Sequence, residues 1–253
     1  MLRISGKDEK IIEEFQRVHP EAKKKGFGRV FRSPTLFEDM VKSVLLCCAP
    51  WKRSLEMAEA LCDLQFKNKR RRYSSNNYCC KECDEWGIIS YGNYFPSPKE
   101  IANFVDEETL NKKCNLGYRA SIILHLARSI ENGTIKIAEF EEEEEEKLFL
   151  KLNKIKGFGP FTVANIMMCI GFYRHIPVDT ETIKHLHKVH GVESSKMRKK
   201  RQREEVIADI YGKYGPFKCL AYWMEHVEYY ENIVGKLSEL PHSQYSNVTT
   251  PNL

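Results

Sequence analysis

The sequence predicts an all-α fold on three observations. Apolar residues recur every three or four positions in most segments, and only residues 1–7 alternate in the manner of a strand. A five-residue segment with two glycines, 155–159, joins two such helical segments, which is typical of a tight hairpin. The 253 residues, 42% of them hydrophobic, can bury one sizeable core or two small ones. No apolar run approaches the ~18 residues of a membrane span, so the sequence excludes a membrane-embedded protein.

The periodicity places the elements in chain order. A strand is expected at 1–7, and helices at 8–19, 36–46, 54–65, 97–105, 107–113 and 117–132. Glutamates within 139–146 open the helix that enters the hairpin, where negative charge suits the helix dipole. After the hairpin, a basic patch at 194–203 lies between helices, and the segment from Tyr211 begins a last core helix that continues to Tyr230.

The hairpin itself is suited to binding a phosphate. Gly157 and Gly159 adopt backbone conformations that other residues resist, and they allow another backbone to approach closely. The helix that follows begins with unpaired amides at the positive end of its dipole, where a phosphate can dock. A carboxylate, Asp179, then stands at the start of a further helix.

Four motifs resemble those of one enzyme superfamily. They are I-K-G-F-G-P-F-T-V-A-N (155–165), P-V-D-T (177–180), L-G-Y-R-A (116–120) and F-R-S-P-T-L-F-E (31–38). In their order along the chain they resemble the motifs of the helix-hairpin-helix (HhH-GPD) DNA glycosylases, in the branches of 3-methyladenine DNA glycosylase II and 8-oxoguanine DNA glycosylase. The resemblance extends from about residue 31 to residue 230.

The resemblance implies two helical lobes with a cleft between them. One lobe carries the hairpin and Asp179, and the other is built from discontinuous flanks. Residues 31–66 and 97–236 would form the glycosylase core, and 67–96 an inserted basic loop. Residues 1–30 would be a strand and helix that remain from an N-terminal β domain, which is otherwise missing. Residues 237–253 are expected to be a disordered tail.

Asp179 is the expected catalytic residue. A base glycosylase breaks a C1′–N bond through an oxocarbenium-like sugar, and a fixed carboxylate beside C1′ stabilises that transition state and orients water. The resemblance assigns this role to Asp179. The same residue also suits the N-cap of a helix opening at Thr180, and the two roles are compatible.

Phe161 indicates the reaction subtype. Bifunctional members of the family place a Schiff-base lysine two residues past the second hairpin glycine, where this chain has Phe161. The resemblance therefore implies a monofunctional glycosylase. An aromatic ring here also suits an electron-poor, alkylated base, which it attracts by stacking and by cation–π interaction. Simple core packing of Phe161 is the alternative.

DNA contacts are expected from the hairpin and from the junction between the first two core helices. The residues assigned to DNA are Ile155, Lys156, Gly157, Phe158, Gly159, Phe161, Thr162, Arg53 and Arg119. In the family, polar residues of the junction fill the gap left by an extruded base. Here Cys48 and Ala49 occupy those places. Cys48, Trp51 and Phe161 are our candidates for the base pocket. For Trp51, a position in the hydrophobic core is an equally good interpretation.

No redox cofactor or metal is assigned. One C-x-x-C, Cys80 to Cys83, has no second pair at zinc spacing, and we read His175, His185, His187 and His190 as surface or packing residues. The resemblance admits a monovalent cation at the hairpin carbonyls. The nine cysteines are read as mostly reduced thiols of an intracellular protein.

Net charge and basic clusters agree with a nucleic-acid partner. The chain carries +5 although six negative charges are concentrated at 141–146. The basic run 67–72 is a nuclear import signal, a DNA clamp or a solvated segment, and we expect a nuclear protein. The sequence thus predicts a monomeric base-excision-repair enzyme that flips a damaged base out of duplex DNA and hydrolyses its glycosidic bond. A non-catalytic DNA-binding module and a bifunctional glycosylase/lyase stay open as alternatives.

Overall fold

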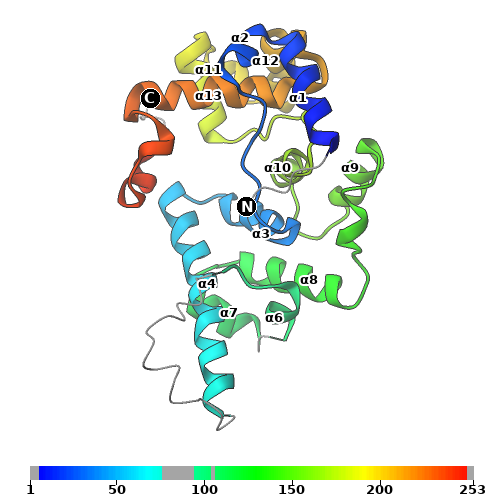
Figure 1. The fold of residues 1–253 in the computed structure, drawn as a ribbon, viewed down its shortest axis with the longest axis vertical. Coiled ribbons are helices and arrows are strands. Elements are labelled where there is room, and N and C mark those ends of the chain that lie inside the picture. Colours follow the sequence, from blue (N-terminus) through cyan, green and yellow to red (C-terminus); the bar gives the residue numbers. More distant parts are fainter. Residues whose placement is uncertain (1–5, 76–93, 104–105, 250–253) are drawn as a thin grey trace. The chain divides into compact units, whose positions relative to one another are not determined.

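A computed structural model of the chain describes residues 6–75, 94–103 and 106–249 (Figure 1). These ranges contain helices and turns and no strand, so the all-α fold class is confirmed. The chain divides into two compact units, one formed by Met1–Asp39 with Ala138–Leu253 and the other by Met40–Ile137. The hairpin and Asp179 thus belong to the discontinuous unit. From the sequence we had placed the discontinuous segments in the other lobe. Within the described ranges no helix is long and apolar enough to cross a membrane.

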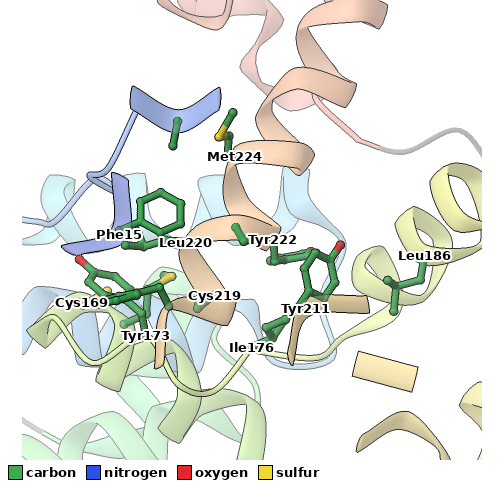
Figure 2. Packing of buried hydrophobic residues seen from close by; sticks show 14 of the residues in the cluster. Phe15, Cys169, Tyr173, Ile176, Leu186, Tyr211, Cys219, Leu220, Tyr222 and Met224 are labelled. Carbon is green, nitrogen blue, oxygen red and sulfur yellow. The ribbon is translucent and has the colours of Figure 1, made fainter. Parts of the chain in front are cut away.

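The discontinuous unit consists of helices from both ends of the chain. They are α1 (Gly6–Val18), α2 (Pro20–Lys25), α9 (Glu145–Asn153), α10 (Pro160–Ile170), α11 (Thr180–His190), α12 (Lys200–Tyr211) and α13 (Lys218–Val234), with 3₁₀ turns η2 (Ser194–Met197), η3 (Gly212–Phe217), η4 (Leu237–Glu239) and η5 (His242–Asn247). Helix α13 is central to the buried apolar cluster of this unit, since five residues of the cluster belong to it. Phe15 of α1 and Tyr173, from the loop after α10, pack in one cluster with Leu220 and Met224 of α13 (Figure 2). This cluster fixes the termini of α10, α11 and α13 with respect to one another.

The contiguous unit is a smaller helical array. It comprises most of α3 (Leu36–Leu46), α4 (Trp51–Ser75), α6 (Pro98–Ala102), α7 (Glu107–Cys114) and α8 (Arg119–Glu131). Helix α6 packs against α8, and α7 contacts both α4 and α8. Side chains end or begin these short helices: Asp106 accepts a hydrogen bond from the Thr109 amide at 2.7 Å, and Ser97 and Glu100 form a capping box.

Several boundaries differ from those expected. Residues 6–7, placed in a strand, are the first turn of α1, because Asp8 and Glu9 favour a helix start. The hexamer 67–72, placed in a loop, continues α4, because lysine and arginine are good helix formers. Residues 76–93 of that expected loop, including the C-x-x-C pair, lie outside the described residues.

Three further corrections concern the discontinuous unit. Helix α9 begins only at Glu145, after the 3₁₀ turn η1 (Ile137–Glu139), so most glutamates of the acidic run precede the helix. Helix α12 ends at Tyr211, and α13 begins at Lys218 after η3, where Gly215 has φ +57° and Pro216 interrupts the helix. The expected disordered tail contains the turns η4 and η5.

Candidate functional site

Two buried side chains anchor the hairpin between α9 and α10. Ile155 and Phe158 are each 9% exposed, and the Phe158 amide donates a hydrogen bond to the Ile155 carbonyl at 3.1 Å. Lys156 and Gly157 are exposed between them. Gly157 has φ +87°, a left-handed conformation that favours glycine. The apolar pair anchors the hairpin, and its exposed surface is backbone and one lysine.

Helix α10 begins at the hairpin without a capping side chain among the described residues. Gly159 is its N-cap, in an extended conformation, and Pro160 follows as the first helical residue. The Val163 amide donates to the Gly159 carbonyl at 3.0 Å. Pro160 has no N–H and the Val163 amide is bonded, so the amides of Gly159 and Phe161 remain for an anion at the positive end of the dipole. Thr162 was expected to contact DNA, but it is fully buried, so its side chain is not available for that contact. Phe161 is half-buried.

Asp179 caps α11 through a reciprocal pair of contacts with Thr182. Its Oδ1 accepts hydrogen bonds from the Thr182 amide at 2.8 Å and from the Thr182 hydroxyl at 3.0 Å. The Asp179 amide donates to the same hydroxyl at 3.4 Å, which completes a capping box. The prediction that Asp179 caps this helix is confirmed. One oxygen of the carboxylate is therefore held in place by the helix it starts.

Asp179 combines solvent exposure with incomplete hydration. The residue is exposed, yet the surrounding protein reduces the hydration of its carboxyl group and raises its pKa above the ordinary value for aspartate. Hydrogen bonds from Thr182 act in the opposite direction and favour the ionised form. In its ionised form, a carboxylate with reduced hydration interacts strongly with a developing cation.

In the contiguous unit, the junction between α3 and α4 forms a fixed loop. Cys48 is exposed and has φ +51°, which is rare for a residue with a Cβ. The Tyr118 hydroxyl donates to the Cys47 carbonyl at 3.2 Å, and the Arg119 guanidinium donates to the same carbonyl and to Leu116. Arg119, assigned to DNA from the sequence, is thus buried and shapes the loop instead. The Tyr118 ring is exposed and lies against that guanidinium. Tyr118 was not among the candidate site residues named from the sequence.

Two further expected residues flank this loop. Trp51 is 38% exposed at the start of α4. The alternative interpretation, a tryptophan in the hydrophobic core, is therefore wrong. Arg53 is exposed, and its guanidinium lies 3.4 Å from the Asn115 carbonyl. Cys48, Trp51 and Arg53 are therefore gathered around one junction of the contiguous unit, whereas Phe161 and Asp179 belong to the discontinuous one.

The comparison with solved structures identifies the fold. The 8-oxoguanine glycosylase/lyase of Clostridium acetobutylicum matches with a TM-score of 0.57 and 19% identity over 86% of this chain and 70% of its own. The same enzyme in complex with double-stranded DNA matches with a TM-score of 0.55. The 3-methyladenine DNA-glycosylase from Archaeoglobus fulgidus matches with a TM-score of 0.56 and 15% identity over 90% of this chain and 70% of its own. This chain has the helix-hairpin-helix DNA glycosylase fold.

Comparison of the sequence with those of known proteins gives a shorter match, also to a protein named as a DNA glycosylase. The protein YfjP of Bacillus subtilis, named "Putative DNA-3-methyladenine glycosylase", is 30% identical over 74 residues. These residues are 29% of this chain and 25% of the relative, so the match spans a quarter of that protein's length. No family model matches the chain. The glycosylase fold is thus established by structure, over most of the chain.

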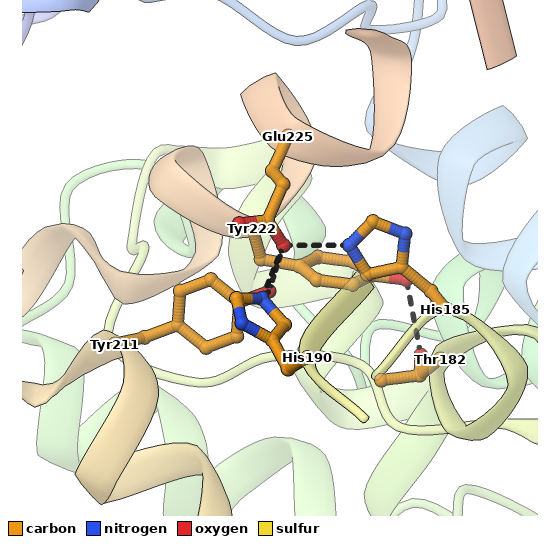
Figure 3. A network of polar contacts seen from close by, with 6 residues as sticks. All are labelled: Thr182, His185, His190, Tyr211, Tyr222 and Glu225. Atoms are coloured by element: carbon orange, nitrogen blue, oxygen red, sulfur yellow. Dashed lines mark hydrogen bonds and ion pairs between the residues drawn. The ribbon is translucent and has the colours of Figure 1, made fainter. Parts of the chain in front are cut away.

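A polar cluster joins α11, α12 and α13; His185 and Tyr211 in it are buried, Glu225 is half-buried and His190 is exposed (Figure 3). Glu225 Oε1 accepts hydrogen bonds from His185 Nε2 at 2.7 Å, from His190 Nε2 at 2.8 Å and from the Tyr211 hydroxyl at 2.6 Å. Burial by itself raises the pKa of Glu225, but these hydrogen bonds outweigh it and lower the pKa to about 2. The cluster therefore holds an ionised carboxylate that ties three helices together.

This cluster also has the ligand types of a zinc site. His185, His190 and Glu225 place one ligand atom each within 4.8 Å of the others. Two atoms bound to one tetrahedral zinc at about 2.0–2.1 Å would lie roughly 3.3 Å apart, farther than the 2.7 and 2.8 Å seen here. A metal-bound His185 would also carry its proton on Nδ1, which is buried and has no partner among the described residues. The geometry favours a hydrogen-bonded cluster.

Sequence reasoning missed Thr182, Tyr222 and Glu225. A signal for Thr182 existed, because D-x-x-T has the spacing of a capping box. Tyr222 and Glu225 gave none, since each contacts a partner about 40 positions away along the chain. His185, read as a packing residue, is buried and also hydrogen-bonded.

The cluster predicts how stability depends on pH. Burial, and then the proximity of His185, lower the pKa of the buried His226 to about 3. Between pH 6.5 and 3 the unfolded chain therefore binds a proton that the folded chain does not, and stability is lost as the pH falls, by up to about 1.4 kcal/mol per pH unit. Glu225 adds a loss below pH 4.5. Urea unfolding of wild type and His226→Phe at pH 7.5, 5.5 and 4.5 should show a smaller loss in the variant.

The exposed His242 provides the control for this prediction. His242→Phe makes the same chemical change outside the cluster and should retain the wild-type dependence on pH. Equal slopes for wild type and His226→Phe over this range would contradict the assignment of a neutral His226.

Proposed function

We propose that this chain is a DNA N-glycosylase that hydrolyses the bond between a damaged base and its deoxyribose in duplex DNA. The observation that carries the proposal is Asp179, held by Thr182 at the start of α11 in a chain with the glycosylase fold. In the reaction the C1′–N bond breaks and the base leaves with the bonding electrons. Asp179 stabilises the positive sugar and receives the proton of the water that adds to C1′.

We propose an alkylated base as the substrate. An N-alkylated purine is positively charged and leaves as a neutral molecule, so its departure needs no proton donor. The aromatic ring of Phe161, half-buried in the first turn of α10, would attract such a base by cation–π interaction. The related protein YfjP and the Archaeoglobus fulgidus enzyme are named for 3-methyladenine, which agrees with this choice. The Clostridium acetobutylicum neighbour is named for 8-oxoguanine, so a panel of lesions must decide.

The uncapped start of α10 and the exposed Lys156 support docking of the DNA backbone at the hairpin. Contacts of this kind do not depend on sequence, so the protein would scan DNA without preference for flanking bases. We propose that it acts as a monomer, by flipping the base out of the duplex. We also propose that it works in the nucleus, which the distribution of a tagged protein in cells would test.

Removal of the Asp179 charge separates catalysis from capping. Asp179→Asn retains an oxygen for both Thr182 hydrogen bonds, and Asn caps helices about as well as Asp. We expect single-turnover base release to fall ~10²–10³-fold while the melting temperature is unchanged. In the wild type, base release should decrease on acidification at a pH above the ordinary pKa of aspartate, because protonation removes the charge and the pKa of Asp179 is raised.

Asp106 offers a matched control for this substitution. It caps α7 through the Thr109 amide in the same way, within the contiguous unit. Asp106→Asn should leave base release at the wild-type rate. A normally melting Asp179→Asn protein that still excises at the wild-type rate would assign Asp179 to capping alone and favour the non-catalytic alternative or another catalytic residue.

The aromatic residue at 161 predicts a monofunctional enzyme. Without an amine in that position no Schiff base forms with C1′, so base release should leave the abasic strand intact until alkali is added. Borohydride reduction during the reaction should trap no protein–DNA adduct. An adduct that forms with wild type and disappears in Lys154→Gln or Lys156→Gln would instead establish a lyase and identify its amine.

Gly159→Ala tests the hairpin. A Cβ on Gly159 would meet no atom within 4 Å, and its φ of −101° suits alanine, so the variant should fold. The added methyl group would obstruct a phosphate at the α10 amides. Affinity for duplex DNA should fall, and the log–log slope of affinity against salt should become shallower by about 0.9 for each phosphate that the protein no longer binds. Gly157→Ala is less informative because its φ of +87° strains any other residue.

Gly212→Ala is the matched glycine control, since its surroundings are equally open and it lies away from the hairpin. It should bind DNA as wild type does. Unchanged affinity and salt slope in Gly159→Ala would remove this hairpin from the DNA interface.

A further inference from the structure

The Thr182 hydroxyl lies at the meeting point of four polar groups. It is 3.0 Å from Asp179 Oδ1, 3.2 Å from the Pro177 carbonyl, 3.4 Å from the Asp179 amide and 3.1 Å from the Tyr222 hydroxyl. A hydroxyl has one hydrogen to donate and two lone pairs that accept. The Asp179 amide is a donor and occupies one lone pair. What Tyr222 does therefore decides where the Thr182 hydrogen goes.

Tyr222 is held with its hydroxyl 3.1 Å from the Thr182 hydroxyl. The residue is buried, its ring is stacked on His226 at 5.1 Å, and the edges of His185 and Tyr211 pack around it (Figure 3). Burial raises the pKa of Tyr222 well above its ordinary value, so the phenol keeps its proton at every relevant pH. A phenol is a better donor than an aliphatic hydroxyl. Tyr222 therefore donates to the second lone pair of Thr182.

With both lone pairs occupied, Thr182 acts as a donor toward Asp179 or Pro177. The carboxylate is the stronger acceptor because it is charged, and it is also the nearer of the two. Each bond in such a chain polarises the next one, so donation by Tyr222 strengthens donation by Thr182. The chain from Tyr222 through Thr182 to Asp179 thus has one consistent direction.

We propose that Tyr222 is a positioning residue for base excision, which directs the Thr182 hydroxyl onto Asp179 Oδ1 and so fixes the carboxylate beside the sugar. This inference rests on the proposed function. A purely structural role does not require the hydroxyl: phenylalanine would fill the same space without a buried polar group that needs a partner.

The test is Tyr222→Phe in the full chain, with two readouts. The first is the pKa of the Asp179 carboxyl group, followed by carbon-13 NMR during a pH titration. It should rise, because the charged form loses part of its hydrogen bonding. The second is single-turnover release of an alkylated base, which should fall about tenfold, the loss of one hydrogen bond of about 1.4 kcal/mol. Melting temperature controls for folding.

Tyr211→Phe is the matched control. It removes a buried hydroxyl from the same cluster, but that hydroxyl bonds to Glu225 and not to Thr182. We expect it to lower the melting temperature and to leave both readouts unchanged. If Tyr222→Phe does not fold, Thr182→Val, which removes the hydroxyl that links Tyr222 to Asp179, should by itself raise the pKa of the Asp179 carboxyl group and slow base release. In a double-mutant cycle, Tyr222→Phe should slow base release no further in the Thr182→Val background.

The outcomes are distinguishable. If Tyr222→Phe leaves the pKa of Asp179 unchanged, or raises it without slowing base release, the inference is wrong while the proposed function stands. Additive effects of Tyr222→Phe and Thr182→Val would also overturn it. If wild type releases no base from any lesion duplex, the proposed function fails, and with it the role in excision. The NMR titration would still show whether Tyr222 reaches Asp179.

Discussion

The capping box at the start of α11 is the interaction on which the candidate site depends. A carboxylate on a flexible loop would sample many orientations, whereas Asp179 is tied to a helix by the amide and the hydroxyl of Thr182. The cap also satisfies an amide at the helix N-terminus that would otherwise lack a partner. One set of contacts thus starts the helix and fixes the carboxylate. A preorganised charge of this kind stabilises a developing cation without reorganisation during the reaction.

The cap in turn depends on the packing of α13. This helix is apolar on the side that meets Phe15 and Tyr173, and it carries Tyr222 and Glu225 toward α11. Burial of a tyrosine hydroxyl and a carboxylate is costly unless each finds partners. Here each does, and the partners all belong to α11 or α12. The polar cluster therefore specifies how these helices meet, which an apolar core alone would leave less defined.

The fold class and the positions of most helices were predictable because helical periodicity is strong over long segments, as in α3 and α10. Asp179 and the hairpin glycines were predictable because local motifs position them. Arg119 shows the limit of such reasoning. Its motif identified the right place in the chain, but not that the guanidinium would be buried against the Cys47 carbonyl. Tyr222 was beyond sequence reasoning, since its role arises only when residues 40 apart in the chain meet.

Two opposing effects act on the same carboxylate, and their balance makes a capping aspartate suited to the catalytic role that we propose for it. Poor hydration raises the pKa of Asp179, and the Thr182 hydrogen bonds counter this rise. A carboxylate that was only a cap would gain from full hydration, and one that was only desolvated would become protonated and lose its charge. Hydrogen bonds to one side of the group favour its ionised form while water is partly excluded. An ionised, poorly hydrated carboxylate interacts with an oxocarbenium ion more strongly than a hydrated one does, because the effective dielectric around it is lower.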